Sequence, residues 1–323
     1  MKLASFHASG ADRLGFLAED GALRDIADLL GPQTPSDMIA LIDAGPAFLD
    51  QLIAAASTAC LTDIPAYALD SVQWRAPVPA PGKVVCIALN NAALDAIKVK
   101  APVDHPAFFL KPATAVTGHR QPILMKAAYG FTHPEPELGV VIGAQIKDAS
   151  PQEALSAVFG YTIVNDVTSV GMREEDSFSL RYFSPDPDGD GLLEGLAHTT
   201  YPGRYKASDS FAPMGPFLTT VDEVPDPSTL SIQCLMQDRL VASDHTGNYV
   251  WSVADALSHI SRTMTLLPGD VVSMGTAVGG DQQDPDKPDI PGVTRCNLNH
   301  FDGVVEIEIT GLGCLENPIV QVG

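Results

Sequence analysis

The chain has 323 residues, a length that allows one large domain or two smaller ones. Acidic residues number 40 against 19 basic residues, so the formal net charge is −21 at pH 7. Binding to nucleic acids and to anionic membranes draws on Lys and Arg, so this balance excludes both as principal partners. Hydrophobic residues make up 45% of the chain and charged residues 18%, which excludes intrinsic disorder.

The five cysteines are scattered singly and form no C-x-x-C pair. This usage is typical of a reducing compartment and not of a disulfide framework. No stretch approaches the roughly 18 uninterrupted apolar residues of a membrane span, and the first residues lack the apolar core of a signal peptide. We therefore expect a soluble cytoplasmic protein.

The first 75 residues predict a small α/β unit. Strands are expected at residues 3–6 and 13–16, and helices at 25–30, 35–43 and 45–59, from the spacing of apolar residues. Prolines at the alternate positions 77, 79 and 81 then force an extended connector. We place a domain boundary here, with a small N-terminal domain over residues 1–75 and a second domain over residues 76–323.

After the connector, the chain changes to short β-like runs bounded by Gly, Pro and Asp. Strands are expected at 83–89, 138–143, 160–164, 231–236, 271–275 and 304–309. Helices are expected at 151–158 and 252–266, the second with Ser252 as its N-cap. A segment rich in Asp, Gly and Pro at 184–203 predicts a long loop that covers the site. The fold class is therefore α+β and mostly β.

The most informative stretch for chemistry contains His133, Glu135 and Glu137. If it is extended, alternate side chains share one face, so the three would point the same way. Two neighbouring carboxylates repel and are costly to desolvate together, and a divalent cation is the usual way to hold them. The alternative is a solvated edge strand without an ion. Asp166 adds a third carboxylate at the end of a later apolar strand.

Several motifs occur in a fixed order along residues 75–323. They read H-x-E-x-E-L-x-V-V-I-G from His133, G-Y-T-x-x-N-D-V from Gly160, K-x-x-D-x-F-A-P-x-G-P from Lys206, and L-x-P-G-D-V-x-x-x-G-T ending at Thr276. In this combination the chain resembles the fumarylacetoacetate hydrolase superfamily. The resemblance implies a mixed β-roll catalytic domain with a small N-terminal α/β domain, and it implies a homodimer.

The resemblance also assigns candidate roles. The carboxylates that match the family's ligands for Mg²⁺ or Mn²⁺, with Ca²⁺ as a further candidate, are Glu135, Glu137 and Asp166. Lys206 and His133 are the candidate catalytic residues, with orientation of a carboxylate as the plainer role of His133. The candidate substrate-binding residues are Gly275, Thr276, Arg173 and Asn90.

The chain departs from the family pattern where a His and a Glu usually activate water. Leu94 and Ile97 stand at these positions, and neither can move a proton. Asn91 stands where the family usually has Tyr. Another residue could replace the missing base, and the candidates are Asp95, His105, His119, His198 and His245. Alternatively, the reaction needs no activated water, or the protein has no turnover.

A 2-oxo acid chelates a divalent ion through its carboxylate and keto oxygens, and the ion stabilises the enolate. The sequence therefore predicts a metal-dependent hydrolase that cleaves a carbon–carbon bond of a small anionic 2,4-dioxo acid. The alternatives are an isomerase or tautomerase, a decarboxylase or a lyase acting on a 2-oxo acid. A metal-binding homologue without catalysis is the third possibility.

Overall fold

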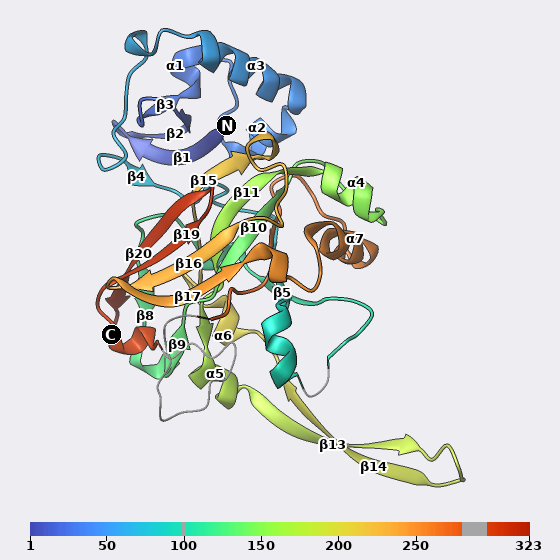
Figure 1. Ribbon diagram of the computed structural model, residues 1–323. Helices are drawn as coiled ribbons and strands as arrows, with labels where there is room; N and C mark the ends of the chain where they lie inside the picture. The colour runs from blue at the N-terminus through green and yellow to red at the C-terminus, as the bar shows by residue number, and fades with distance from the viewer. Residues whose placement is uncertain (99–100, 280–295) are drawn as a thin grey trace.

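The structure is a computed structural model that describes residues 1–98, 101–279 and 296–323 (Figure 1). Its described helices are α1 (Ile26–Leu30), α2 (Met38–Asp43), α3 (Pro46–Thr58), α4 (Pro151–Ser156), α5 (Val170–Glu175), α6 (Arg204–Ala207) and α7 (Val253–Thr263). The predicted helices in both parts of the chain are confirmed. Ser252 caps α7 as expected, because its side chain accepts a hydrogen bond from the backbone of Asp255.

Among the described residues, the largest sheet has eleven strands and a mixed pattern. Nine of them follow one another in the order β3 (Leu23–Asp25), β2 (Ala11–Leu17), β1 (Lys2–Ala8), β15 (Ala212–Thr220), β11 (Val158–Asn165), β10 (Pro136–Ile142), β18 (Val271–Ser273), β5 (Val84–Ala88) and β6 (Ala107–Lys111). β4 (Gln73–Trp74) pairs with β1, and β7 (Val116–Thr117) runs parallel to β15. β5 and β18 are also parallel, whereas β10 and β11 are antiparallel.

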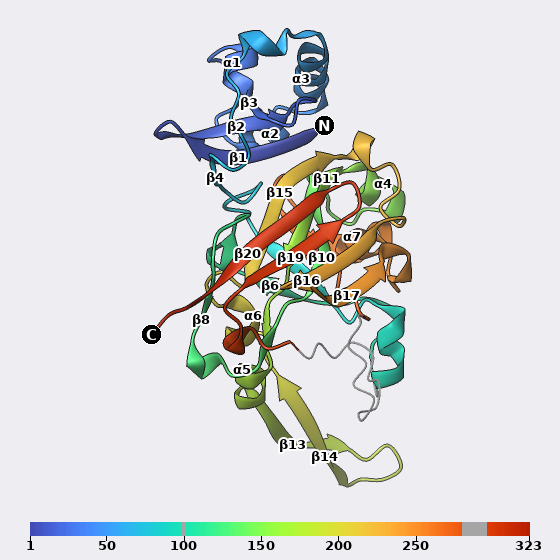
Figure 2. The same cartoon turned by 60° about the vertical axis from the view of Figure 1, so that its left-hand side comes forward.

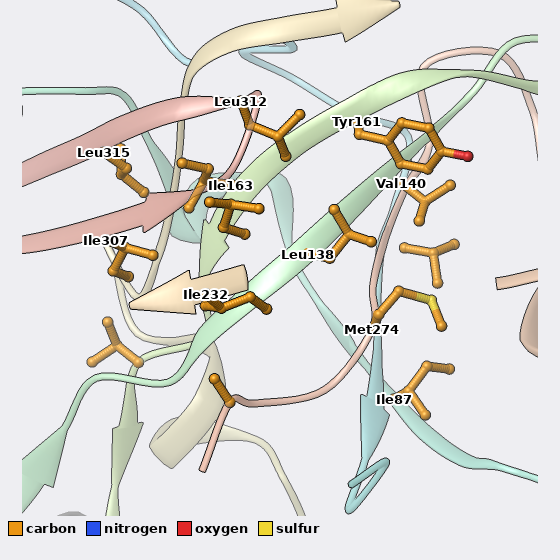
Figure 3. Packing of buried hydrophobic residues seen from close by; sticks show 14 of the residues in the cluster. Ile87, Leu138, Val140, Tyr161, Ile163, Ile232, Met274, Ile307, Leu312 and Leu315 are labelled. Atoms are coloured by element: carbon orange, nitrogen blue, oxygen red, sulfur yellow. The ribbon is translucent and has the colours of Figure 1, made fainter. Parts of the chain in front are cut away.

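A second sheet has five strands in the described residues and packs against the first. Its order is β17 (Arg239–His245), β16 (Ser231–Met236), β19 (Val304–Ile309), β20 (Gly313–Gln321) and β8 (Ile123–Met125). Leu138 and Ile163 from the first sheet share one buried cluster with Ile232, Ile307 and Leu315 from the second (Figure 3). Burial of this apolar surface is the main force that holds the two sheets together. The predicted fold class, mostly β with mixed sheets, is confirmed.

The N-terminal strands continue the large sheet. β1 pairs with β15 through Lys2↔Thr219 and Leu3↔Leu218. A second buried cluster joins Leu3 and Met38 to Val141 and Met214 of the following part of the chain. The domain boundary at residue 75 stays a prediction, and it lies in a region where sheet pairing and apolar packing connect both sides.

One predicted element is wrong. Residues 184–203 do not form a long loop, because β13 (Ser177–Pro185) pairs along its whole length with β14 (Leu192–Thr200). The residues rich in Asp, Gly and Pro make only the turn at 186–191. A small separate pair, β9 (Thr132–His133) with β12 (Thr168–Ser169), lies beside the candidate site. Within the described residues, no helix combines the length and apolar character needed to cross a membrane.

Candidate metal centre

The three predicted ligand carboxylates come together at one end of the β10–β11 pair. Because β10 and β11 are antiparallel, the start of β10 lies opposite the end of β11, with Pro136 facing Asn165. Glu135 immediately precedes β10, Glu137 lies within it, and Asp166 immediately follows β11. One oxygen from each carboxylate lies within 4.8 Å of the other two. This is a donor set that could hold a hard divalent cation.

Backbone contacts fix this arrangement. The Asp166 amide donates to the carbonyl oxygen of Glu135 at 2.9 Å. The Asn165 side-chain oxygen accepts from the Glu135 amide at 3.0 Å. The predicted continuous strand from His133 to Glu137 is instead interrupted, because β9 ends at His133 and β10 begins at Pro136. The interruption leaves Glu135 partly exposed while Glu137 and Asp166 are buried.

Two buried ammonium groups oppose the carboxylates. Lys206 on α6 donates to Glu135 Oε2 and to Asp166 Oδ2, each at 2.6 Å. Lys111 at the end of β6 lies 2.5 Å from Asp166 Oδ1, yet that oxygen accepts no well-directed hydrogen bond. Lys111 also donates to the backbone carbonyls of Phe211 and Val167. When all three carboxylates are ionised, they exceed the two ammonium groups by one negative charge, which a bound cation would balance.

The pKa shifts of Glu137 and Asp166 are caused by burial and by the neighbouring charges. Burial, together with the charges of Asp166 and Glu135, raises the pKa of Glu137 to about 8. Glu137 Oε2 accepts hydrogen bonds from Ser273 Oγ at 2.6 Å and from the Gly275 amide at 2.9 Å, which opposes part of this rise. Burial alone would raise the pKa of Asp166 as well, but Lys111 and Lys206 hold it below its ordinary value. Glu137 is therefore the carboxylate whose ionised form a neighbouring cation would stabilise most.

His133 lies beside Glu135, with 3.8 Å between its Nε2 and Glu135 Oε1. Its Nδ1 lies 3.2 Å from the carbonyl oxygen of Pro134, which can only accept, so Nδ1 carries the proton and Nε2 has a free lone pair. Burial lowers the pKa of His133, Glu135 opposes this effect, and the charges of Lys206 and Arg173 add to it. A neutral imidazole beside the carboxylates can accept a proton.

The four predicted substrate-binding residues differ in their surroundings. Gly275 has a φ of +105° and lies against Asn90, where an added Cβ would be 2.8 Å from Asn90 Cβ. Asn90 uses both amide hydrogens on the carbonyls of Met274 and Trp251, and its oxygen accepts from the Trp251 amide. Thr276 is half-buried and donates to the carbonyl of Ala277, and Arg173 on α5 is exposed. Asn90 therefore packs against the Gly275 turn and stabilises it through its hydrogen bond to Met274.

The positions that depart from the family pattern are apolar or engaged elsewhere. Leu94 lies in the short 3₁₀ segment Ala92–Ile97 and is buried. The side chain of Ile97 lies outside the described part of the structure. Asn91 is buried and donates to Asp244 at 2.7 Å and to the carbonyl of Thr276 at 3.3 Å. Asn91 therefore ties this segment to the turn that carries Gly275.

Among the described contacts, none of the five candidate replacement bases pairs with the carboxylates. Asp95 is exposed and pairs with Lys98, and His105 stacks on His259 with ring centres 4.9 Å apart. His119 accepts a hydrogen bond from the amide of Glu316, within β20. The remaining two, exposed on other strands, are His198 beside Ser179 and His245 beside Gly247. His133 is the imidazole that the structure places against the carboxylates.

The sequence alone gives too little weight to two residues. Lys111 is assigned no role by the sequence motifs, and in the structure Lys111 contacts Asp166 directly. Ser273 is not singled out by any motif, although its hydroxyl donates to Glu137. A signal existed for Ser273, since it lies two residues before Gly275 on the strand that pairs with β10.

Comparisons with known proteins show the family to which the chain belongs. Residues 83–320 match the family model of the fumarylacetoacetate (FAA) hydrolase C-terminal domain. The chain is 29% identical over 280 residues to the 2,4-didehydro-3-deoxy-L-rhamnonate hydrolase of Sphingomonas sp. (86% of this chain and 85% of the relative). It is 29% identical over 282 residues to the mitochondrial oxaloacetate tautomerase FAHD2B of Bos taurus (86% and 82%).

The same fold is found in a solved enzyme that contains a metal ion. The crystal structure of maleylpyruvate hydrolase from Sphingobium sp. SYK-6 in complex with manganese(II) and pyruvate matches all of both chains, with a TM-score of 0.72 and 27% identity. These relatives are enzymes that include hydrolases and tautomerases. The chain belongs to the fumarylacetoacetate hydrolase family.

Proposed function

We propose that this protein is an enzyme that enolises a small anionic 2-oxo acid, with keto–enol tautomerisation as its net reaction and Mg²⁺ or Mn²⁺ as its cofactor. The observation that carries the proposal is the group formed by the partly exposed Glu135 and the buried Glu137 and Asp166, with His133 as the imidazole beside it in the described part of the chain. Relatives at 29% identity include an oxaloacetate tautomerase, which supports the same class of reaction.

The metal would be held by the three carboxylates, whose donor type suits a hard cation and whose charge Lys111 and Lys206 only partly balance. When bound there, a divalent ion supplies Lewis-acid polarisation of the substrate's keto oxygen. Lys206 places its ammonium between Glu135 and Asp166 and orients both carboxylates. It is also the side chain best placed to favour negative charge on a substrate oxygen.

His133 carries the proton in this proposal. Tautomerisation breaks one C–H bond at C3 and forms one O–H bond on the former keto oxygen, so a single group that accepts and returns a proton is sufficient. His133 Nε2 has the free lone pair for that step. Carbon–carbon hydrolysis needs an activated water in addition, and the position of the usual histidine is the buried, apolar Leu94.

Carbon–carbon hydrolysis of a 2,4-dioxo acid is the second candidate. The specific observation in its favour is that relatives over most or all of the chain include a rhamnonate-derived hydrolase and a maleylpyruvate hydrolase. A decarboxylase or lyase would use the same enolate and also needs no activated water. In every case the substrate is a small anion, and the net charge of −21 does not favour nucleic acid or membrane partners.

The test is a mass-resolved assay on the purified chain. The substrates are oxaloacetate and a panel of acylpyruvates, each with Mn²⁺ and with EDTA. The proposal predicts EDTA-sensitive loss of the ultraviolet enol band at unchanged substrate mass, and loss of that activity in His133→Gln. Two products of lower mass would establish hydrolysis or decarboxylation instead, and metal binding with no product would leave a non-catalytic homologue.

A further inference from the structure

Asp244, near the end of β17, joins three segments that lie around the candidate metal centre. Its Oδ2 accepts from Asn91 Nδ2 and from the Val278 amide, each at 2.7 Å. Its Oδ1 accepts from Asn248 Nδ2 at 2.6 Å and from the His245 amide at 2.8 Å. In both views the teal segment that follows β5 lies beside the end of β17 (Figures 1 and 2). One carboxylate therefore connects the segments that follow β5, β17 and β18.

The contacts of Asp244 are suited to holding other groups in place. All four donors are uncharged amides, two from the backbone and two from side chains. Hydrogen bonds to an ionised carboxylate are stronger than those between neutral groups. Asp244 is half-buried, which limits competition from water. Its side chain therefore acts as a strong acceptor at the point where the three segments meet.

The turn at residues 274–278 leaves one backbone amide for a ligand. The amides of residues 274, 275 and 277 donate to β10, and that of Val278 donates to Asp244. In the described part of the chain, the remaining amide, that of Thr276, donates to no protein group. Thr276 is half-buried, so this amide is available to a substrate carboxylate. β10 thus holds the first part of the turn, and Asp244 holds its end.

Asn91 attaches the segment after β5 to the same turn. Besides its contact with Asp244, its Nδ2 donates to the carbonyl of Thr276 at 3.3 Å. Its Oδ1 accepts from the Ala93 amide at 3.0 Å, at the start of the 3₁₀ segment Ala92–Ile97. The tyrosine that the family usually has at this position could not make these contacts, because a hydroxyl donates only one hydrogen bond. The amide side chain therefore gives this segment an attachment specific to this chain.

We propose that Asp244 is a positioning residue. Together with Asn91 it holds the turn at Thr276 and the segment Ala92–Ile97 in the arrangement that receives the substrate's carboxylate. The proposal rests on the proposed function, in which the substrate is a small 2-oxo acid. Asp244 acts through the turn and makes no contact with the substrate. Holding the turn in its binding geometry beforehand lowers the entropic cost of binding the substrate.

The first test is hydrogen exchange of the metal-free full chain, which does not depend on activity. Asp244→Asn keeps the size of the side chain but replaces one acceptor oxygen by a donor, which then faces other donors. The amides of Val278 and Leu94 should exchange at least about 10-fold faster than in the wild-type chain. Amides of β10 and β11 should keep their exchange rates.

Asp226→Asn is the matched control. Asp226 also accepts from neutral donors, the Ser228 amide at 2.9 Å and Ser228 Oγ at 2.7 Å, and its described contacts lie within its own turn at 226–229. Exchange at Val278 and Leu94 should be unchanged in this variant.

A further variant, Asn91→Ala, separates the two attachments. It removes the contact with Asp244 but leaves the bond between Asp244 and the Val278 amide. The Leu94 amide should therefore exchange faster, whereas the Val278 amide should keep its protection.

The second test is the affinity of the Mn²⁺-loaded chain for pyruvate, measured by calorimetry. Asp244→Asn and Asn91→Ala should each weaken pyruvate binding by about 10-fold. The affinity for Mn²⁺ alone should stay within about twofold, because the donors to Glu137 remain in place. The KM for a 2-oxo acid should rise by the same factor as the pyruvate dissociation constant, with kcat little changed.

Unchanged exchange at Val278 and Leu94 in Asp244→Asn, or equal changes in Asp226→Asn, would overturn the proposal. Wild-type pyruvate affinity in Asp244→Asn would overturn it as well. If Asp244→Asn does not fold, wild-type pyruvate affinity in Asn91→Ala has the same meaning. A wild-type chain that neither binds nor converts any 2-oxo acid would instead contradict the proposed function, while exchange at Val278 would still show whether Asp244 holds the turn.

Discussion

Lys111 provides the sharpest test of the electrostatics at the candidate metal centre. Its ammonium is fully buried and lies 2.5 Å from Asp166 Oδ1. Lys111→Met keeps most of the side-chain volume and removes the charge. Breaking a buried pair by removing one partner costs about 3–5 kcal/mol, and in this variant the three carboxylates keep Lys206 but lose their second ammonium group. We expect the metal-free variant to lose about that much of its free energy of unfolding.

The corresponding change in thermal midpoint follows from the chain length. An unfolding entropy of about 2.1 cal/mol/K per residue, over 323 residues, gives about 0.7 kcal/mol/K. The midpoint of the metal-free variant should therefore fall by about 4–7 °C. Without the ammonium, the carboxylates attract a divalent cation more strongly, so added Mn²⁺ should raise the midpoint more in Lys111→Met than in the wild-type chain.

Lys83→Met is the matched control. Lys83 pairs with the buried Asp270 in a similar way, but neither residue contacts the three carboxylates. This variant should also be less stable, while the Mn²⁺-induced rise in midpoint should equal that of the wild-type chain. Differential scanning fluorimetry with EDTA and with Mn²⁺ measures the midpoints of the wild-type chain and of both variants. An Mn²⁺ effect in Lys111→Met no larger than in Lys83→Met would refute the reasoning.

Three further predictions use other parts of the structure. Burial lowers the pKa of His119 to about 4, below the value of about 6.5 in the unfolded chain. The unfolded state therefore binds the proton first as pH falls, and this residue should cost about 2 kcal/mol of stability between pH 7 and pH 5. Urea unfolding should show this loss of stability in the wild-type chain and a smaller loss in His119→Gln. An equal pH dependence in the two proteins would contradict the prediction. Gly275→Ala should lower both stability and Mn²⁺ affinity, because φ is +105° and the new Cβ would meet Asn90. Wild-type affinity in that variant, measured by calorimetry, would show that the turn does not support Glu137. Leu94→Ala should lower stability by about 2–5 kcal/mol because it leaves a buried cavity. Turnover of the folded variant should stay within a few-fold of the wild-type value. A hundredfold loss of turnover would mean that this position contributes to catalysis.

The elements that sequence reasoning predicts correctly are those in which local pattern and burial agree. The apolar runs at β10, β11 and β16 and the amphipathic segment of α7 follow their expected periods. The β13–β14 hairpin is missed because its composition suggests a loop. Its turn is rich in Asp, Gly and Pro, and its strands have no buried face in the described residues to produce a regular core signal.

At the site, spacing along the chain predicts which carboxylates come together but not what surrounds them. Lys111 meets Asp166 only because β6 and the end of β11 are brought together by the fold, and its other partners are the carbonyls of Val167 and Phe211. The bracing role of Asn90 is likewise a product of contacts with Met274 and Trp251, far away in the chain. Non-local contacts of this kind leave no periodic trace in the sequence.

The most direct test of the proposed enolisation is exchange of the C3 protons of a 2-oxo acid with solvent. Proton NMR of pyruvate in D₂O, with the wild-type chain and Mn²⁺ at catalytic concentration, should show deuterium incorporation at the methyl group. The exchange should stop with EDTA and in Asp166→Asn, which removes one of the three grouped carboxylates. Exchange that persists without metal or with Asp166→Asn, or no exchange with the metal-loaded wild-type chain on any 2-oxo acid tested, would contradict the account.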